Sequence, residues 1–481
     1  MRTHFALKTA GALFLLFGVT NLPPLVLSIV SADGLVQEFS IAVGIALVGG
    51  LLLLLKTFHR ETTLRTRDGF LIVGLLWTGM SLLGAIPFMM TLHLDFVDAL
   101  FESASGYTTT GSTVIEGLDE LPRSILLYRQ EIQWIGGIGV IVVAIALLPM
   151  LRVGGMQLYK AETPGQLKDE RITPRLAKTA KNILIIYGVL TVACGLAYWL
   201  AGMDAFDAVA HSLSTLSTGG YSTHDASLGF FQSDAINAIA IFFMLVGAIS
   251  FSVHFIAWRE MRPAFYARDS QTRAFLLIAL ILTIIVGSQL FEQGVTSTPL
   301  RSVEVAAFEV VSVISSTGFG VADFAQWPLD LPVLMIFLSF IGGCAGSTAG
   351  GIKVMRFLVL EKQARSHVSK LIHPRSMNPI RIDQHVVDPS VIEGIWGFFT
   401  VYIAIFATFM LILTLDGMDQ VTAFGAVASC LNNLGPGLGE VSLNFANVSG
   451  GGKLLLALAM LFGRLEIFTV LVLITPSFWR S

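Results

Sequence analysis

Long apolar segments are the feature that most constrains how this chain of 481 residues folds. Hydrophobic residues make up 54% of the sequence and charged residues 13%, about half the charged share of a typical soluble domain. A helix of about 20 apolar residues crosses the roughly 30 Å hydrocarbon core of a bilayer. Segments of this length recur along the chain, so the sequence predicts an all-α polytopic membrane protein. The ten predicted spans cover residues 9–30, 39–55, 70–92, 132–150, 183–201, 236–257, 274–291, 331–352, 396–415 and 454–475.

Three observations exclude other classes of protein. The first span follows Arg2 and Lys8, as a signal peptide would, but it is too long for a cleaved segment and is expected to be retained. The cysteines Cys194, Cys344 and Cys430 show no C-x-x-C spacing and are predicted to be inert buried thiols. The nine histidines show no metal-ligand spacing. We therefore expect no cofactor bound by this chain and no nucleic-acid partner.

Basic residues collect in every second loop between the predicted spans. One side of the membrane receives 25 of the 30 Lys and Arg residues, with the largest basic loops at 152–181 and 353–381. The positive-inside rule places these loops and both termini in the cytoplasm. Acidic residues predominate on the other side, with 21 of 33. This excess either concentrates cations at an outer mouth or belongs to an ordinary solvated face.

A unit of 19 residues recurs four times in the outer segments. The copies read DFVDALFESASGYTTTGST (95–113), DAFDAVAHSLSTLSTGGYS (204–222), SVEVAAFEVVSVISSTGFG (302–320) and DQVTAFGAVASCLNNLGPG (419–437). Each begins with an acid or hydroxyl residue, continues for about three helical turns and ends in a polar turn that contains glycine. Aligned on Gly111, Gly219, Gly318 and Gly435, the copies recur at intervals of 108, 99 and 117 residues, which indicates an internal repeat.

Each copy predicts an outer helix, a half-spanning helix, an extended turn and an inner helix. Acidic residues near the half-helix starts complement the positive end of the helix dipole, and these are Asp98, Asp207, Glu304 and Asp419. Non-helical backbone in mid-membrane is tolerable where it is buried in protein or lines a wet cavity. Four turns around one axis would form a pseudo-fourfold ring of carbonyl oxygens that replaces the water shell of a cation. The predicted filter residues are Thr109, Thr110, Gly111, Ser217, Thr218, Gly219, Ser316, Thr317, Gly318, Asn433, Leu434 and Gly435.

The repeats also predict the organisation of the chain around one pore. Residues 1–68 form a two-helix N-terminal extension, and the four pore repeats follow at 69–181, 182–271, 272–393 and 394–481.

These motifs resemble the Trk/Ktr/HKT superfamily of potassium transporters, and most closely its bacterial Trk-type uptake subunits. The resemblance covers essentially the whole chain, and the two extra N-terminal spans match the Trk type. In the HKT branch, Ser in place of the first filter Gly is associated with sodium permeation, so the four glycines here favour potassium. The motifs are TTTGST, LSTGGYSTHDASLG, SSTGFG and NNLGPG at the turns, QWIGGIGVIVVAIALLPML and RVGGMQLYKAETPG within 133–165, GGCAGSTAGGIK at 342–353, and GRLE at 463–466.

The resemblance implies potassium uptake across the bacterial inner membrane rather than an enzyme activity. It implies a homodimer with one pore per subunit. It also implies a separate cytosolic Rossmann-type (RCK) ring that binds a nucleotide and controls gating. The transported K⁺ is expected to bind backbone carbonyls at Thr110, Gly111, Thr218, Gly219, Thr317, Gly318, Leu434 and Gly435.

The segment GGCAGSTAGGIK carries five glycines within 342–351, each costing a helix about 1 kcal/mol relative to Ala. We expect it to unwind the eighth span, and the resemblance implies an intramembrane gating loop at 342–353 beneath the filter. Close helix packing through small residues is the alternative. A phosphate-binding Walker A loop is excluded, because that motif needs contiguous Gly-Lys-Ser/Thr after a strand. The predicted gate residues are Gly346, Ser347, Thr348, Ala349, Gly350, Gly351 and Arg464.

Arg464 is the one cation that the sequence places inside a predicted span. Such a charge is costly in a bilayer and usually faces a water-filled cavity, which predicts a position on the pore. The alternative is a structural ion pair with Glu466, although residues two apart on a helix do not face each other.

The same residues bear on three possible functions. A channel-like potassium-uptake subunit is the leading interpretation. A secondary transporter that couples K⁺ to H⁺ or Na⁺ is the alternative, and it would need a titratable group on the ion path. An intramembrane enzyme lacks a Ser/His, Asp/Asp or metal constellation in the predicted spans.

Overall fold

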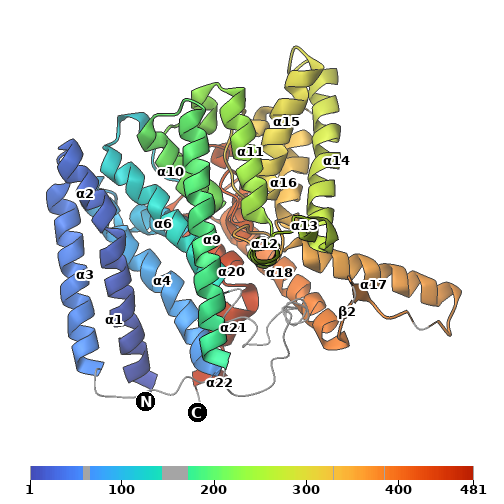
Figure 1. Ribbon diagram of the computed structural model, residues 1–481, viewed down its shortest axis with the longest axis horizontal. Helices are drawn as coiled ribbons and strands as arrows, with labels where there is room; N and C mark the ends of the chain where they lie inside the picture. Colours follow the sequence, from blue (N-terminus) through green and yellow to red (C-terminus); the bar gives the residue numbers. More distant parts are fainter. Residues whose placement is uncertain are drawn as a thin grey trace.

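The computed structural model describes residues 2–57, 66–143, 172–328, 330–376, 378–383 and 385–479, and this part of the chain is mainly helical (Figure 1). The α-helices are α1 Arg2–Thr20, α2 Leu22–Ser31, α3 Val36–Thr57, α4 Thr66–Thr91, α5 Phe96–Tyr107, α6 Arg123–Val142, α9 Ile172–Leu200, α10 Ala205–Leu216, α11 Asp234–Ala248, α12 Phe251–Glu260, α13 Ala264–Arg268, α14 Ser270–Glu292, α15 Pro299–Ile314, α16 Leu331–Ile341, α17 Val354–Ile372, α18 Pro389–Leu415, α19 Gln420–Asn432, α20 Gly450–Arg464, α21 Ile467–Ile474 and α22 Pro476–Trp479. Short 3₁₀ helices are η1 Leu118–Glu120, η3 Ser227–Phe231, η4 Phe324–Gln326 and η5 Gly439–Val441. Strands β1 Arg381–Ile382 and β2 His385–Val386 pair antiparallel, with Arg381 opposite Val386.

Six helical segments in the described residues are long and apolar enough to cross a membrane. The number rises to eight if each of two sharply bent helix pairs is counted as one span, α11 with α12 at 96° and α20 with α21 at 112°. The ten predicted spans are therefore found only in part. The segment predicted at 331–352 is helical only to Ile341, as expected from the glycines that follow, and the end of the span predicted at 132–150 lies outside the described residues. The six segments are Leu7–Ser31, Val36–Thr57, Asp68–Thr91, Lys178–Leu200, Ser270–Glu292 and Pro389–Leu415.

The bend between α11 and α12 has a specific hydrogen-bonding partner. Ile249 adopts an extended conformation there, which interrupts the helical ladder. The backbone N–H of Phe251 donates to the carbonyl of Gly346 at 3.0 Å, and the carbonyl of Ala248 accepts from the N–H of Cys344 at 2.9 Å. Because a buried backbone group without a partner is costly, these two bonds to the non-helical segment 342–353 stabilise the break in the helix.

Four short helices, α5, α10, α15 and α19, contain the repeated sequence unit. Their lengths are 12, 12, 16 and 13 residues. A side-chain oxygen at each N-cap accepts a backbone N–H from the first turn, and the caps are Asp95, Asp204, Thr298 and Asp419. Asp98 and Asp207 lie in first turns, as predicted, but Glu304 lies deeper in α15, where Thr298 is the cap.

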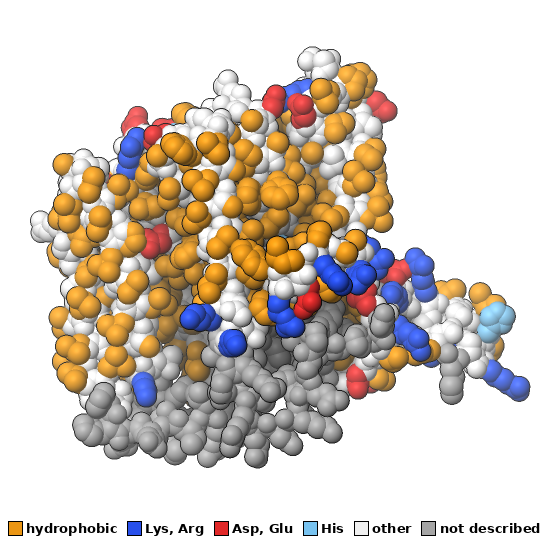
Figure 2. Space-filling model, in the orientation of Figure 1, with side chains coloured by type: hydrophobic (Ala, Val, Ile, Leu, Met, Phe, Trp, Pro, Cys, Tyr) orange, Lys and Arg blue, Asp and Glu red, His pale blue; other side chains and the backbone are white. Residues whose placement is uncertain are grey.

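The arrangement in space fits a membrane protein. α1 and α3 pack against each other and against α4 at one side of the molecule, while α17 projects from the opposite side (Figure 1). The start of α1 and the final helix α22 lie at the same lower edge (Figure 1). Hydrophobic side chains cover most of the visible face, and Lys and Arg gather below them and along α17 (Figure 2). The three cysteines are free and buried, as predicted.

Candidate functional site

The four half-helices end in one and the same backbone turn. After each helix a non-glycine residue takes the left-handed conformation, with φ of 52° at Thr109, 49° at Thr218, 52° at Ser316 and 54° at Asn433. The next N–H then bonds the carbonyl of a serine five residues back, which is the Schellman pattern of helix ends. These bonds are Thr110 to Ser105 at 2.8 Å, Gly219 to Ser214 at 2.9 Å, Thr317 to Ser312 at 2.8 Å and Leu434 to Ser429 at 2.9 Å.

A glycine with positive φ follows each of these turns, six residues after the serine. The four are Gly111 at 87°, Gly220 at 79°, Gly318 at 80° and Gly435 at 108°. The second copy therefore differs from the predicted alignment by one residue, because its matching glycine is Gly220 and not Gly219. Gly219 instead occupies the position of Thr110, Thr317 and Leu434.

The four glycines meet the neighbouring copies in a closed cycle. A Cβ atom added to any of them would face a backbone carbonyl oxygen of the next copy, which it would clash with at Gly111, Gly220 and Gly318 and crowd at Gly435, and the positive φ disfavours a side chain at all four. These distances are 2.3 Å from Gly111 to Gly219, 1.9 Å from Gly220 to Thr317, 2.1 Å from Gly318 to Leu434 and 3.1 Å from Gly435 to Thr110. The order runs from copy one through two, three and four back to one, so the turns surround a common centre.

The polar side chains of the turns are buried, and many of their hydrogen bonds lie within the turns. Thr108 bonds Thr110 at 2.7 Å in the first copy, and Ser315 bonds Thr317 at 2.7 Å in the third. Two carbonyls predicted to bind the ion accept side-chain bonds. The Gly219 carbonyl accepts from Gln133 at 2.6 Å, and the Gly435 carbonyl accepts from two serine hydroxyls.

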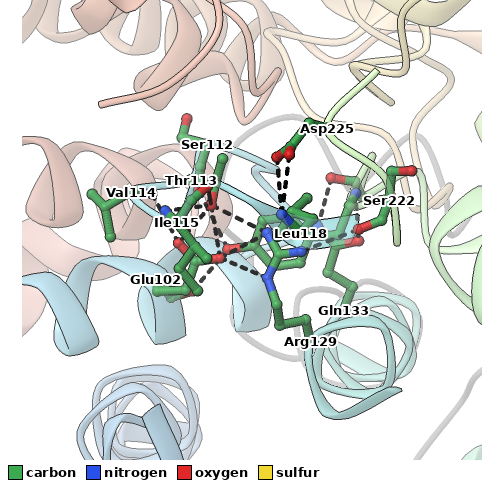
Figure 3. Close-up of polar contacts among 12 residues, drawn as sticks. Glu102, Ser112, Thr113, Val114, Ile115, Leu118, Arg129, Gln133, Ser222 and Asp225 are labelled. Carbon is green, nitrogen blue, oxygen red and sulfur yellow. Dashed lines mark hydrogen bonds and ion pairs between the residues drawn. The ribbon is translucent and has the colours of Figure 1, made fainter. Parts of the chain in front are cut away.

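A buried ion pair lies next to the chain segments that follow the first two turns (Figure 3). Glu102 of α5 and Arg129 of α6 approach to 2.9 Å, and their side chains are 0% and 1% exposed. No other ion pair in the described residues is so completely buried. Sequence analysis did not identify this pair.

The segment 342–353 contacts the C-terminal ends of three of the four short helices. The Gly350 N–H donates to the Ser316 hydroxyl of the third copy, and the Gly351 N–H donates to the Asn432 carbonyl of the fourth at 3.0 Å. Thr348 donates to the Leu216 carbonyl, at the end of the second half-helix, at 3.1 Å. Its glycines make these approaches possible, since a Cβ at Gly350 would lie 2.1 Å from the Asn432 oxygen.

Arg464 joins the first copy to the same segment. Its guanidinium donates to the Thr348 carbonyl at 2.8 Å and to the Thr109 hydroxyl at 2.5 Å. The alternative pairing with Glu466 was wrong, because Glu466 pairs with Arg356 at 2.6 Å. Glu466 has φ of 55° at the bend between α20 and α21, so it does not continue the helix of Arg464.

Three of the acidic residues in the predicted outer segments, Asp119, Asp207 and Asp225, bond other protein groups. His224 lies 2.5 Å from Asp119 and 3.3 Å from Asp207, which joins the outer segments of the first two copies. The hydrogen bond from His224 lowers the pKa of Asp119. Asp225 accepts from the N–H of Leu118 (Figure 3).

Two signals in the sequence could have improved the predicted site. Ser105, Ser214, Ser312 and Ser429 each precede the turn glycine by six residues, and this spacing would have identified Gly220. Glu102 and Glu309 occupy the same place in their copies, three residues before the serine, as does His211. A polar residue recurring inside a short apolar helix indicates a buried structural contact.

Comparison with known proteins assigns the chain to a family. A model of the cation transport protein family TrkH matches residues 36–481. The chain is 47% identical to the Trk system potassium uptake protein TrkH of Halomonas elongata and 45% identical to that of Escherichia coli K12, over 100% and 99% of this chain and all of each relative. The crystal structure of the potassium transporter TrkH from Vibrio parahaemolyticus superposes with a TM-score of 0.93 at 44% identity, and the match covers 100% of both chains. The chain therefore belongs to the TrkH family of cation transport proteins.

Proposed function

We propose that this chain carries K⁺ into the cell across the bacterial cytoplasmic membrane. The observation that carries the proposal is the closed cycle of four glycines, each facing a backbone carbonyl of the next copy. Carbonyl oxygens held at such a constriction replace the water shell of a cation. With the four copies aligned on Gly111, Gly220, Gly318 and Gly435, the filter carbonyls belong to the residue before each glycine. These residues are Thr110, Gly219, Thr317 and Leu434. Relatives named potassium uptake proteins support K⁺ as the ion.

The gate consists of segment 342–353 and Arg464. The segment contacts the second, third and fourth copies directly, and Arg464 extends the contact to Thr109 of the first. A permanent cation 4 Å from a permeating ion opposes it by about 4 kcal/mol at an effective dielectric near 20. Opening of the gate moves the segment away and withdraws Arg464 from the Thr109 hydroxyl.

Control from the cytoplasm belongs to the same proposal. The start of α1 and the helix α22 lie at one edge of the molecule, and basic side chains gather near that edge and on α17 (Figures 1 and 2). This edge faces the cytoplasm by the positive-inside rule, and it receives a separate nucleotide-binding ring in a homodimeric assembly. Much of the predicted docking loop 152–181 lies outside the described residues.

Coupling of K⁺ to H⁺ is the second candidate, and one observation favours it. Glu309, 1% exposed, lies beside the third turn and receives its bonds from the N–H groups of Val321 and Ala322. It is a titratable group close to the filter. Reversal potentials that shift with an imposed pH gradient would support coupling, whereas potentials that follow the K⁺ gradient alone would support the channel-like function.

The filter is tested by Gly318→Ser in proteoliposomes, with K⁺ and Na⁺ flux compared. A side chain there meets the Leu434 carbonyl, so the preference for K⁺ should fall sharply. Gly294→Ser is the matched control, because Gly294 also has positive φ, 70°, but has open space around it. Wild-type selectivity in the Gly318→Ser variant would refute the filter assignment.

A further inference from the structure

The buried pair Glu102–Arg129 connects two filter copies as well as two helices. Arg129 lies on α6, the inner helix of the first copy (Figure 3). One of its nitrogens donates to the Thr113 hydroxyl of the first copy at 3.1 Å, and another donates to the Ser222 carbonyl of the second copy at 3.1 Å. Its third nitrogen donates to Glu102 at 3.0 Å. The planar guanidinium therefore holds both filter strands and its own counter-ion at once.

Glu102 completes the contact on the side of the first copy. Its second oxygen accepts from the Thr113 hydroxyl at 2.9 Å and from the Val114 N–H at 3.0 Å. These two residues come directly after the turn that contains Gly111. The carboxylate thus fixes the backbone position of the residues that follow the turn.

Tyr221 and Gln133 extend the same support into the second copy. The Arg129 guanidinium stacks over the Tyr221 ring at 4.2 Å, and the Tyr221 hydroxyl donates to the Glu102 carbonyl at 2.9 Å. Gln133, one turn after Arg129 on α6, donates to the Gly219 carbonyl and accepts from the Tyr221 N–H. The strand that contains Gly219 and Gly220 is held from behind by side chains of the first copy.

We propose that Arg129 is a positioning residue for ion selectivity, which fixes the first two filter strands relative to each other through Thr113, Ser222 and Glu102. The inference rests on the proposed filter function and names the residues that set its geometry. Arg129 does not contact the ion. It acts by preventing the Thr110 and Gly219 carbonyls from moving apart, and selectivity depends on the spacing of such carbonyls.

The decisive variant is the double substitution Arg129→Gln with Glu102→Gln. It removes both charges together, so no unpaired charge stays buried and the protein should fold. Gln is too short to reach Thr113 and Ser222 together. We expect the K⁺/Na⁺ flux ratio in proteoliposomes to fall by about tenfold, roughly the effect of one lost charge-assisted hydrogen bond. Arg123→Gln, an exposed arginine at the start of the same helix, is the control and should keep the wild-type ratio.

Each outcome decides the proposal. A folded double variant with wild-type selectivity would overturn it and leave the pair a purely structural role. Wild-type selectivity in the single variant Arg129→Lys would also overturn it, because Lys keeps the positive charge but cannot donate to Thr113, Ser222 and Glu102 as the planar guanidinium does. If the double variant does not fold, Thr113→Val replaces it, since that change removes the hydroxyl that bonds both Arg129 and Glu102. A lower ratio in Thr113→Val supports the proposal, and an unchanged ratio refutes it. Failure of the wild-type protein to prefer K⁺ would instead refute the filter function itself.

Discussion

The first and third copies of the repeated unit end in the same backbone turn, but their buried glutamates have different partners. Both have a left-handed residue, a Schellman bond to a serine and a glycine with positive φ. Both place a buried glutamate three residues before that serine, with its carboxylate on the N–H groups of the outgoing strand. Glu102 pairs with Arg129, whereas Glu309 has no ion-pair partner among the described residues.

This difference shows that the turn itself does not require the ion pair. In the third copy the Glu309 carboxylate accepts from backbone N–H groups, and the same turn forms without an ion pair. The pair in the first copy instead connects two copies, because Arg129 donates to the Ser222 carbonyl of the second copy. The second and third copies are connected by backbone and hydroxyl contacts, with Gly229 donating to the Gly320 carbonyl and Gly320 donating to Ser227.

The largest expected contrast is in stability, between Glu102→Gln and Glu309→Gln. Glu102→Gln leaves Arg129 buried without a counter-ion, which should cost about 3–5 kcal/mol. Glu309→Gln keeps an amide oxygen that can accept the same backbone bonds, so it should cost less than about 1.5 kcal/mol. Thermal unfolding of the purified proteins in one detergent measures both. Equal shifts in the two midpoints would show that the two glutamates have equivalent environments.

The second contrast extends the comparison to the second copy, between Gly220→Ala and Gly219→Ala. A Cβ at Gly220 would meet the Thr317 carbonyl at 1.9 Å with φ of 79°. A Cβ at Gly219 would meet the Gln133 side chain, which can move. We expect Gly220→Ala to reduce K⁺ selectivity as strongly as Gly318→Ala, and Gly219→Ala to reduce it less. The reverse order in a flux assay would restore the original alignment on Gly219.

The smallest contrast is in K⁺ flux, between variants that remove the contacts of the first and third copies with segment 342–353. Arg464 connects Thr109 of the first copy to segment 342–353, and Ser316 of the third copy contacts Gly350 of that segment directly. Charge-assisted bonds contribute about 1.5–3 kcal/mol and neutral ones about 0.5–1.5 kcal/mol. Arg464→Ala should therefore raise K⁺ flux per folded protein more than Ser316→Gly, in which glycine retains the left-handed turn. Slower flux in Arg464→Ala would contradict the gate role.

Local sequence predicted a large part of this architecture. The apolar segments indicated a membrane protein, and the four similar units indicated four half-helices with glycine turns. Both features depend on residues close together in the chain, so helix periodicity, N-caps and glycine positions are sufficient to recognise them. The error at Gly219 arose from matching Thr-Gly pairs instead of the serine spacing.

The remaining features depend on contacts that local sequence does not encode. Arg129 meets Glu102 across 27 positions, and Arg464 meets Thr348 and Thr109 across 116 and 355 positions. Glu466 was expected beside Arg464 because it is close in sequence, but the bend at Glu466 directs it to Arg356. The sequence by itself determined the four turns, whose hydrogen bonds are local. The tertiary structure decided which carbonyl each glycine faces and which carboxylate each arginine meets, because those partners come together only when distant helices pack.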